Sequence, residues 1–308
     1  MSKKVLLETR GACVELLDCG VAWLRFTSEG NRVTPAAAAW AAAALHQQQE
    51  GVKAVVVACC AGYDNDEIRT LARSGDWKGL EEASTGFQSL TAAMRGLSVP
   101  VVAALRGTIT DLGVELAMGA DAVCAAEAVV SLGGKDTPFT PTAGGLATLA
   151  LGTYAIGQNV PGCDIVPFLK RAFQLFVTGK PCQSLGEAAQ RGIPLPWSTD
   201  CAPEELEARA TAQALFLAGQ GFVRSAEERT AAVSGTTGAA ALEITAVNLH
   251  RGGFLSQDRY LLAGDAARVL SGGDVPKGTT LTETRLRALE RAAFLTSCRR
   301  LAEKEETA

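Results

Sequence analysis

Glu115 is the residue whose type and setting most suggest chemistry. It stands in the segment VVAALRGTITDLGVELAMGAD, residues 101–121, between Val114 and Leu116 in largely apolar surroundings. A carboxyl group among apolar side chains tends to have a raised pKa, which suits general acid or base catalysis near neutral pH. A glutamate is also favoured in the first turn of a helix on an exposed face, where the helix dipole attracts negative charge. Spacing alone leaves both interpretations open.

The residues before Glu115 predict a strand, a loop and the start of a helix. VPVVAAL is typical of a strand, RGTITDLG is a glycine-broken loop, and a helix is expected from about Val114. The first backbone N–H groups of a helix have no partner within it and lie at the positive end of its dipole. We therefore expect the N–H groups from Leu112 to Glu115 to hold an anion, such as the oxyanion formed on a thioester carbonyl.

Strands and helices alternate along the first part of the chain. GVAWLRFTS has strand character, and VKAVVVACC is a continuous β-branched run of the kind that is buried on both faces. Between them Thr34 is expected to cap a helix with Pro35 at its first position. A second helical spacing in GLEEASTGFQSLTAAMRGL precedes the strand VPVVAAL. Strand, helix and strand in this order predict right-handed parallel crossovers, so the expected fold class is α/β.

The composition changes after about Cys201. Four helical segments follow, in APEELEARATAQALFLAGQGF, GAAALEITAVNLHRGG, SQDRYLLAGDAARVLSGG and TETRLRALERAAFLTSCRRLAEKEE. Their predicted caps and stops are Ser256, Thr282, Gly252 and Gly272. We therefore divide the chain into an α/β core over residues 1–200 and a helical extension over 201–308.

Composition and charge argue against several classes of function. The formal net charge is −4 and the sequence pI is about 5.4, and no basic run is longer than Arg299–Arg300. A nucleic-acid partner is therefore not expected. No stretch reaches the roughly 18 uninterrupted apolar residues of a spanning helix, and MSKKVLLETR lacks the apolar centre of a signal peptide. We expect a cytoplasmic protein with no membrane partner.

Cysteine and histidine usage gives little support to metal binding or to nucleophilic catalysis. The chain has 9 cysteines, which are scattered, odd in number and without a C-x-x-C pair, so free thiols are favoured over disulfides. His46 and His250 are the 2 histidines, too few for a zinc or copper site or for a Ser-His or Cys-His pair to be well supplied. We expect no metal and no resident cofactor.

Several phrases of the sequence resemble the crotonase superfamily, the enoyl-CoA hydratases and isomerases. VKAVVVACCAGYDNDEI, VPVVAALRGTITDLGVELAMGAD and PTAGG follow one another as the family's F-x-A-G-A-D, N-G-x-x-x-G-G-G-x-E-L-A-x-x-C-D and P-G-x-G-G do. This resemblance covers about residues 12–200. It implies a crotonase-like spiral of ββα units, here with a helical C-terminal extension.

The remainder of the chain extends the resemblance. LHRGGFLSQDRYLLAGDAARVLSGGDVPKGTTLTETRLRALERAAFLT is similar to the C-terminal tail of the long bifunctional 3-hydroxyacyl-CoA dehydrogenases, which carry a hydratase/isomerase-like part after their dehydrogenase part. The glycine-rich dinucleotide fingerprint of a dehydrogenase does not occur in this sequence.

The resemblance implies a thioester site built on two loops. Its oxyanion donors would be the backbone N–H groups of Ala61 and Leu112, and Gly62 and Gly113 would lie against the substrate. Glu115 matches the first catalytic glutamate of the hydratases. Coenzyme A would enter only as part of the substrate, and the terminal helices imply a homo-trimer or a hexamer.

The sequence also departs from the family's pattern. Tyr63 stands where a small residue is usual, Asp111 and Leu112 replace glycines of the second loop, and Gly134 takes the place of the second catalytic glutamate. Asp136 could partly substitute for the missing carboxylate. Hydration needs a proton delivered to the α-carbon and a water activated for the β-carbon, work that two carboxylates usually share.

Two functions of different classes remain open. The first is an acyl-CoA enzyme of the hydratase/isomerase type, a lyase or isomerase of fatty acid metabolism with Glu115 as its sole acid/base. The second is a catalytically silent crotonase-fold subunit that binds acyl-CoA, a dehydrogenase or an active paralogue. The retained Glu115 favours the first, because an unused buried carboxylate is costly, and the altered loops favour the second.

Overall fold

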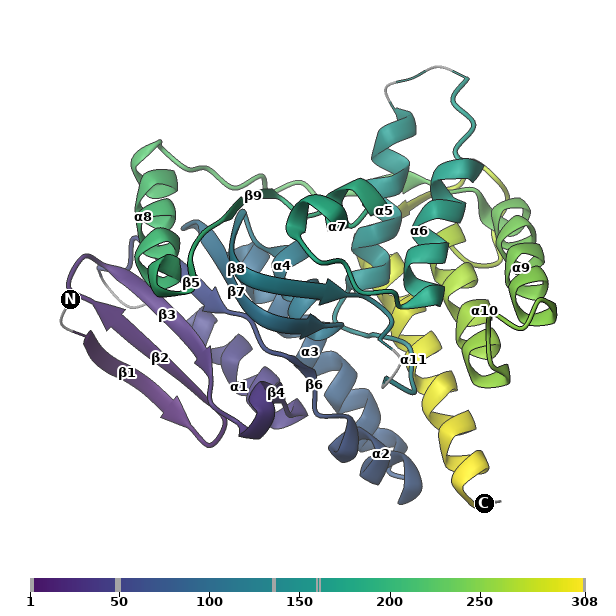
Figure 1. The fold of residues 1–308 in the computed structure, drawn as a ribbon, viewed down its shortest axis with the longest axis horizontal. Coiled ribbons are helices and arrows are strands. Elements are labelled where there is room, and N and C mark those ends of the chain that lie inside the picture. The colour runs from purple at the N-terminus through teal and green to yellow at the C-terminus, as the bar shows by residue number, and fades with distance from the viewer. Residues whose placement is uncertain (1–2, 48–50, 135–136, 159, 161, 307–308) are drawn as a thin grey trace.

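The computed structural model describes residues 3–47, 51–134, 137–158, 160 and 162–306 (Figure 1). Its main sheet, in spatial order, consists of β1 (Lys3–Thr9), β2 (Ala12–Leu17), β3 (Val21–Phe26), β5 (Ala54–Ala58), β7 (Val101–Thr110), β8 (Ala122–Ser131) and β9 (Trp197–Asp200). Two small sheets pair β4 (Arg32–Val33) with β6 (Gly62–Tyr63) and β10 (Thr230–Ala232) with β11 (Thr280–Thr282).

Helices follow the strands, and they include the helices predicted from the sequence. They are α1 (Pro35–His46), α2 (Asn65–Arg73), α3 (Trp77–Gly96), α4 (Leu112–Gly119), α5 (Gly145–Gln158), α6 (Val166–Thr178), α7 (Leu185–Arg191), α8 (Leu206–Gly219), α9 (Gly235–Arg251), α10 (Gln257–Ser271) and α11 (Glu283–Glu306). Two short 3₁₀ helices span Glu29–Asn31 and Pro203–Glu205. The predicted α/β class is confirmed.

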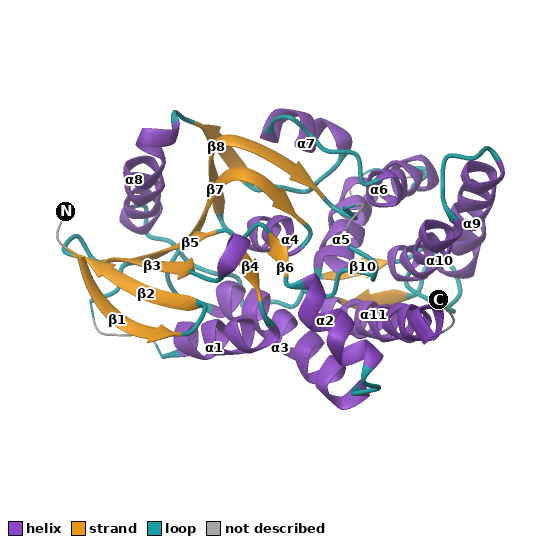
Figure 2. Cartoon of the chain, turned by 60° about the horizontal axis from the view of Figure 1, so that its bottom comes forward, coloured by secondary structure: helices purple, strands orange, loops and turns teal. Residues whose placement is uncertain are grey.

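The main sheet changes from antiparallel to parallel pairing at β3. β1, β2 and β3 form antiparallel pairs, whereas β3–β5, β5–β7, β7–β8 and β8–β9 are parallel. Parallel strands need crossover connections, and those between β3 and β8 include α1, α3 and α4. α1, α3 and α4 lie on one face, and α8 covers the other (Figures 1 and 2).

Local signals account for several helix boundaries. The Thr34 hydroxyl accepts a hydrogen bond from the N–H of Ala37 at 3.1 Å, which caps α1 as predicted. Ser256 caps α10 by the same contact to Arg259 at 3.3 Å, and α10 ends at Gly272, which has φ +90°. The helix that carries Glu115 begins at Leu112, slightly earlier than expected.

The C-terminal helices share the core of the preceding segment. A single buried cluster joins residues of the main sheet to side chains of α9, α10 and α11, among them Leu242, Leu270 and Phe294. On the other face of the sheet, α8 packs on β3, and the Trp23 indole donates a hydrogen bond to the Thr211 hydroxyl at 3.2 Å. The predicted division at residue 200 therefore separates two segments with a common core.

The cysteines are free thiols and most are buried. No helix in the described ranges is both long enough and apolar enough to cross a membrane.

Candidate functional site

Glu115 is enclosed by the protein and does not lie on an exposed helix face. All of α4 is buried, and only 2% of the surface of Glu115 is accessible. The helix packs against β7 and β8, most of whose residues are buried. The interpretation of Glu115 as an exposed first-turn residue is therefore wrong, and burial in apolar walls is confirmed.

Both oxygens of Glu115 already accept hydrogen bonds from the protein. Oε1 accepts from the N–H groups of Ala143 at 3.0 Å and Gly145 at 2.7 Å. Oε2 accepts from the hydroxyl of Tyr63. Ala143 and Gly145 lie at the start of α5, where the first N–H groups have no intrahelical partner. Glu115 lies on α4 and therefore caps the N-terminus of another helix, α5.

Tyr63 fills the space beside this carboxylate. Its ring is 1% exposed and meets Phe87 and Phe139 edge-on, with centroid distances of 4.8 and 5.7 Å. Its hydroxyl accepts from the N–H groups of Thr142 at 2.9 Å and Ala143 at 3.1 Å. A bulky ring at the position where the family has a small residue is thus part of the core, with its polar end fully used.

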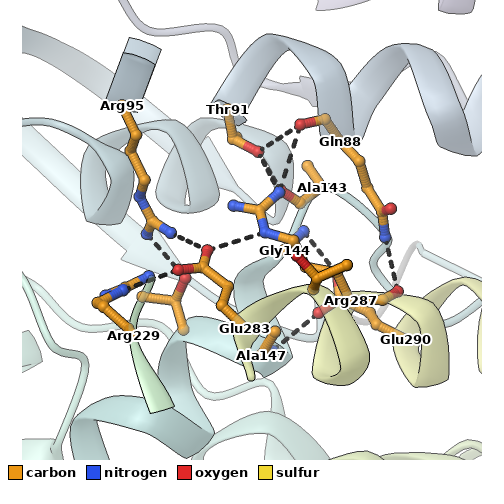
Figure 3. A network of polar contacts seen from close by, with 12 residues as sticks. Gln88, Thr91, Arg95, Ala143, Gly144, Ala147, Arg229, Glu283, Arg287 and Glu290 are labelled. Atoms are coloured by element: carbon orange, nitrogen blue, oxygen red, sulfur yellow. Dashed lines mark hydrogen bonds and ion pairs between the residues drawn. The ribbon is translucent and has the colours of Figure 1, made fainter. Parts of the chain in front are cut away.

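A second buried carboxylate, Glu290 of α11, lies beside the first. It is 0% exposed and accepts from the N–H groups of Gly144 at 2.6 Å and Ala147 at 2.8 Å (Figure 3). Together Glu115 and Glu290 accept from four N–H groups at the start of α5. The loop around Gly144 therefore has its donors directed at the protein's own carboxylates.

Sequence reasoning did not single out Glu290. The signal was available, because Glu290 lies four residues after Leu286 and four before Phe294 on the apolar stripe of α11. A carboxylate inside such a stripe is expected to be buried and paired.

Burial sets the acidity of both carboxyl groups. It raises the pKa of Glu115 well above its ordinary value, and the nearby charge of Glu290 raises it further. Burial likewise raises the pKa of Glu290 to about 7, although the N–H groups of Ala147 and Gly144 oppose the shift. Each group therefore holds a proton more tightly in the folded protein than in the unfolded chain.

The raised pKa values of these two carboxyl groups predict a loss of stability as the pH rises. A carboxyl whose folded-state pKa is raised stabilises the fold fully below its unfolded pKa of 4.5 and loses that contribution as the pH passes about 7. We expect the free energy of unfolding to fall by roughly 2–3 kcal/mol between pH 5 and pH 8. Urea unfolding at several pH values should show a flatter profile in Glu290→Gln. An equally steep fall in that variant would contradict the assignment.

Charged side chains at the start of α11 bind this helix to α3. Arg287 donates to Glu283 at 2.8 Å and to the Thr91 hydroxyl at 2.9 Å, and Arg95 of α3 also pairs with Glu283 (Figure 3). Although burial opposes it, the hydrogen bond from Arg229 and the charges of Arg95 and Arg287 hold the pKa of Glu283 at about 2. The network therefore stays ionised and fixes the start of α11 against the site.

The two loops predicted to form an oxyanion site do meet. The carbonyl of Ala61 accepts from the N–H of Thr110 at 2.8 Å, at the end of β7. The N–H of Ala61, however, donates to the carbonyl of Asn31 at 2.8 Å. Leu112 is fully buried at the first position of α4, which has no side-chain cap. An oxyanion role for Ala61 would require its hydrogen bond to Asn31 to break.

The glycines predicted to lie against a substrate lie against the protein. A Cβ on Gly113 would be 2.2 Å from the carbonyl oxygen of Cys60, and one on Gly62 would be 2.5 Å from the hydroxyl of Thr110. Close approach of the two loops to each other is therefore sufficient to require glycine at both positions.

Asp111 occupies the neighbourhood of the missing second carboxylate. It is fully buried, with φ +37°, and its carboxylate accepts from the N–H groups of Gly133 at 2.6 Å and Gly134 at 3.4 Å and from the Thr137 hydroxyl. A Cβ on Gly134 would be 3.4 Å from Asp111 Oδ2. The predicted substitute Asp136 lies outside the described residues.

Restoring a glutamate at position 134 should therefore destabilise the protein. We expect Gly134→Glu to lower the free energy of unfolding by about 2–4 kcal/mol, because its carboxylate enters a buried space beside Asp111. The cost should be smaller by about 1 kcal/mol or more in an Asp111→Asn background, where the charge is absent. Urea unfolding of the two single variants and the double variant measures this coupling. If the stability losses of the two single variants simply add in the double variant, position 134 and Asp111 do not interact, which would contradict their proximity.

Among the described residues, no group of three or more His, Cys, Asp and Glu side chains could hold a metal ion. His46 ends α1 at the surface, and His250 contacts the carbonyl of Leu255 at 2.9 Å.

The arrangement of the strands and helices defines the fold class of the chain. The mixed sheet, its crossover helices and the helical C-terminal part give the crotonase fold, as the resemblance implied. The first loop follows β5, and the second lies between β7 and α4.

Comparisons with solved structures confirm this fold. The chain is similar to an enoyl-CoA hydratase from Rhodobacter sphaeroides 2.4.1, with a TM-score of 0.58 and 15% identity over 97% of this chain and 91% of that one. A second enoyl-CoA hydratase, from Mycobacterium avium subsp. paratuberculosis K-10, gives a TM-score of 0.51 and 20% identity over 86% and 95%. A third, from Bacillus anthracis, gives 0.52 and 21% over 84% and 90%.

A comparison with curated sequences adds a relative of another name. The chain is 25% identical over 303 residues to a Bacillus subtilis (strain 168) protein named "Probable 3-hydroxyacyl-CoA dehydrogenase". The match covers 96% of this chain but only 37% of that protein. No protein-family model matches the sequence.

Proposed function

We propose that this chain is a non-catalytic crotonase-fold companion of a 3-hydroxyacyl-CoA dehydrogenase. The observation that carries the proposal is the state of Glu115, which is 2% exposed and has hydrogen bonds on both oxygens. An acid/base catalyst must reach the proton it transfers, directly or through one water. Tyr63 and the start of α5 occupy both of its oxygens, so a substrate could reach this carboxylate only by displacing them.

The remaining parts of a hydration site support the same conclusion. The N–H of Ala61 donates to the carbonyl of Asn31. Of the two predicted oxyanion donors, this leaves the N–H of Leu112 alone. Gly134 supplies no carboxylate, and Asp111 beside it is buried and hydrogen-bonded to its own loop. Loss of a single oxyanion donor typically slows acyl transfer about 100-fold to 1,000-fold.

The proposed partner rests on the sequence relative. In the Bacillus subtilis protein, the part similar to this chain makes up 37% of a longer protein named as a dehydrogenase. A chain that is similar to one part of such a protein is expected to pack against the other part, whether in the same polypeptide or in a separate one. We expect no resident cofactor in this part.

An acyl-CoA hydratase or isomerase is the second candidate, and one observation favours it. Burial and the charge of Glu290 raise the pKa of Glu115, as a general acid near neutral pH requires. Catalysis would require Tyr63 to leave the aromatic cluster, so that a thioester could reach the carboxylate.

Complex formation tests the proposed partnership. The chain should be mixed with the 3-hydroxyacyl-CoA dehydrogenase encoded nearest to it in its genome, at about 10 μM each, which detects affinities near 1 μM. Size-exclusion chromatography with light scattering should show a mass equal to the sum of both components, and the same dehydrogenase mixed with an active enoyl-CoA hydratase should not. Separate elution of the chain and the dehydrogenase would contradict the proposal. The mass of the chain alone tests the predicted trimer or hexamer.

A further inference from the structure

A cleft of about 330 Å³ lies apart from Glu115, between α2, α10 and α11. These helices run beside one another at the end of the molecule that carries the C-terminus (Figures 1 and 2). Arg69 of α2, Arg259 of α10 and Arg300 and Lys304 of α11 line it, together with Thr137 of the loop after β8. The cleft therefore gathers cationic side chains from three helices.

The cationic side chains outnumber the acidic ones around this cleft. Lys304 pairs with Asp258, and Arg300 pairs with Asp265. Among the described residues Arg69 has no such pair, although it lines the cleft. An unpaired guanidinium at the wall of a cleft favours an anionic ligand.

Arg259 adds a second positive charge, and none of the described carboxylates lies within hydrogen-bond distance of it. It donates to the carbonyls of Gly133 at 2.9 Å, Phe176 at 2.7 Å and Val177 at 3.0 Å. All three hydrogen bonds come from Nη2, and neutral carbonyls do not cancel the charge of the guanidinium. Burial lowers the pKa of Arg259, and the charge of Asp111 opposes this shift.

The cleft also has an apolar side. Pro138, Leu261, Leu262 and Leu301 line it with the cationic groups. Apolar walls reduce the effective dielectric constant, which strengthens the attraction between a guanidinium and an anion. Guanidinium groups match the geometry of carboxylate and phosphate, because their donors can bind two oxygens at once.

We propose that this cleft is a binding site for a small anion that carries a carboxylate or a phosphate group. The unpaired guanidinium of Arg69 recognises the anionic group. Arg259, Arg300 and Lys304 supply the surrounding positive potential, and the leucines contact the ligand's carbon skeleton. The site does not involve Glu115, so the proposal stands apart from the question of hydration.

Thr137 and Arg259 connect the cleft to the turn after β8. The Thr137 hydroxyl donates to Asp111, and Arg259 donates to the carbonyl of Gly133 in the same turn. An anion bound between Arg69 and Arg259 would therefore hold this turn against α10. Binding should raise the unfolding temperature of the protein, because a ligand that binds only the folded state stabilises it.

Calorimetric titration with two probes, inorganic phosphate and succinate, tests the site. We expect at least one of them to bind with a dissociation constant below about 1 mM, and more weakly as the salt concentration increases. The stronger probe identifies whether phosphate or carboxylate is recognised.

Two variants and a control decide where the probe binds. Arg69→Gln and Leu261→Glu should each weaken binding by about tenfold or more, since one removes the unpaired positive charge and the other adds a negative charge at a partly exposed helix position. Arg10→Gln removes the same charge from an exposed turn outside the cleft and should leave binding unchanged. Absence of binding by both probes at about 10 mM, or unchanged binding in both cleft variants, would overturn the proposal.

Discussion

Replacing Glu115 with alanine should lower the free energy of unfolding by about 3–5 kcal/mol. The variant leaves the N–H groups of Ala143 and Gly145 and the hydroxyl of Tyr63 without their acceptor in a region that water does not reach. It also opens a cavity in the core. A side chain kept only for catalysis would have the opposite effect, because removing a buried carboxylate that lacks partners usually stabilises a protein.

Glu115→Gln is the matched control for this prediction. Glutamine keeps the shape and one acceptor oxygen, so it should cost about 1–2 kcal/mol. Urea unfolding followed by circular dichroism measures both variants. A Glu115→Ala protein within about 0.5 kcal/mol of wild type would show that the hydrogen bonds to α5 contribute nothing.

Replacing Gly113 with alanine is expected to be as damaging, at about 3–5 kcal/mol. The new Cβ would lie 2.2 Å from the carbonyl oxygen of Cys60 and 2.6 Å from the side chain of Ile109. The carbonyl belongs to the backbone of the first loop and cannot rotate away as a side chain can, so α4 or the loop must move.

Gly119 provides a control in the same helix. A Cβ there would meet nothing closer than Arg95 Nε at 3.9 Å. Gly119→Ala should therefore lie within about 1 kcal/mol of wild type, because alanine also favours helix more than glycine does. Equal losses for the Gly113 and Gly119 variants in thermal unfolding would refute the close contact between the loops.

The sequence was sufficient to predict the fold class and many of the elements, but not α2 or α7 and not the partners of the site. β-branched runs, Thr34 with Pro35 and the caps of the C-terminal helices are local signals, and each led to the correct element. The apolar neighbours of Glu115 indicated burial but left an exposed helix start open. Its hydrogen bonds depend on Tyr63 and on the start of α5, which are distant in the chain, so no local pattern contains them.

The hydrogen bond from the Ala61 N–H to Asn31 could not be predicted, for a similar reason. Its acceptor, Asn31, lies next to β4, which pairs with β6 in a sheet of only two residues per strand. Strands of that length have no measurable alternation. The family's pattern places Ala61 in the correct loop, whereas the competing hydrogen bond is a property of this chain's tertiary structure.

The central claim is that Glu115 is a structural carboxylate in a protein that does not hydrate enoyl thioesters. The most direct measurement is the rate at which the purified protein and Glu115→Gln consume short, medium and aromatic trans-2-enoyl-CoA thioesters, followed by loss of the conjugated enoyl absorbance. The account predicts that both proteins match the rate without protein on every substrate, with an active enoyl-CoA hydratase as the positive control. Turnover by wild type that is lost in the folded Glu115→Gln variant would contradict it.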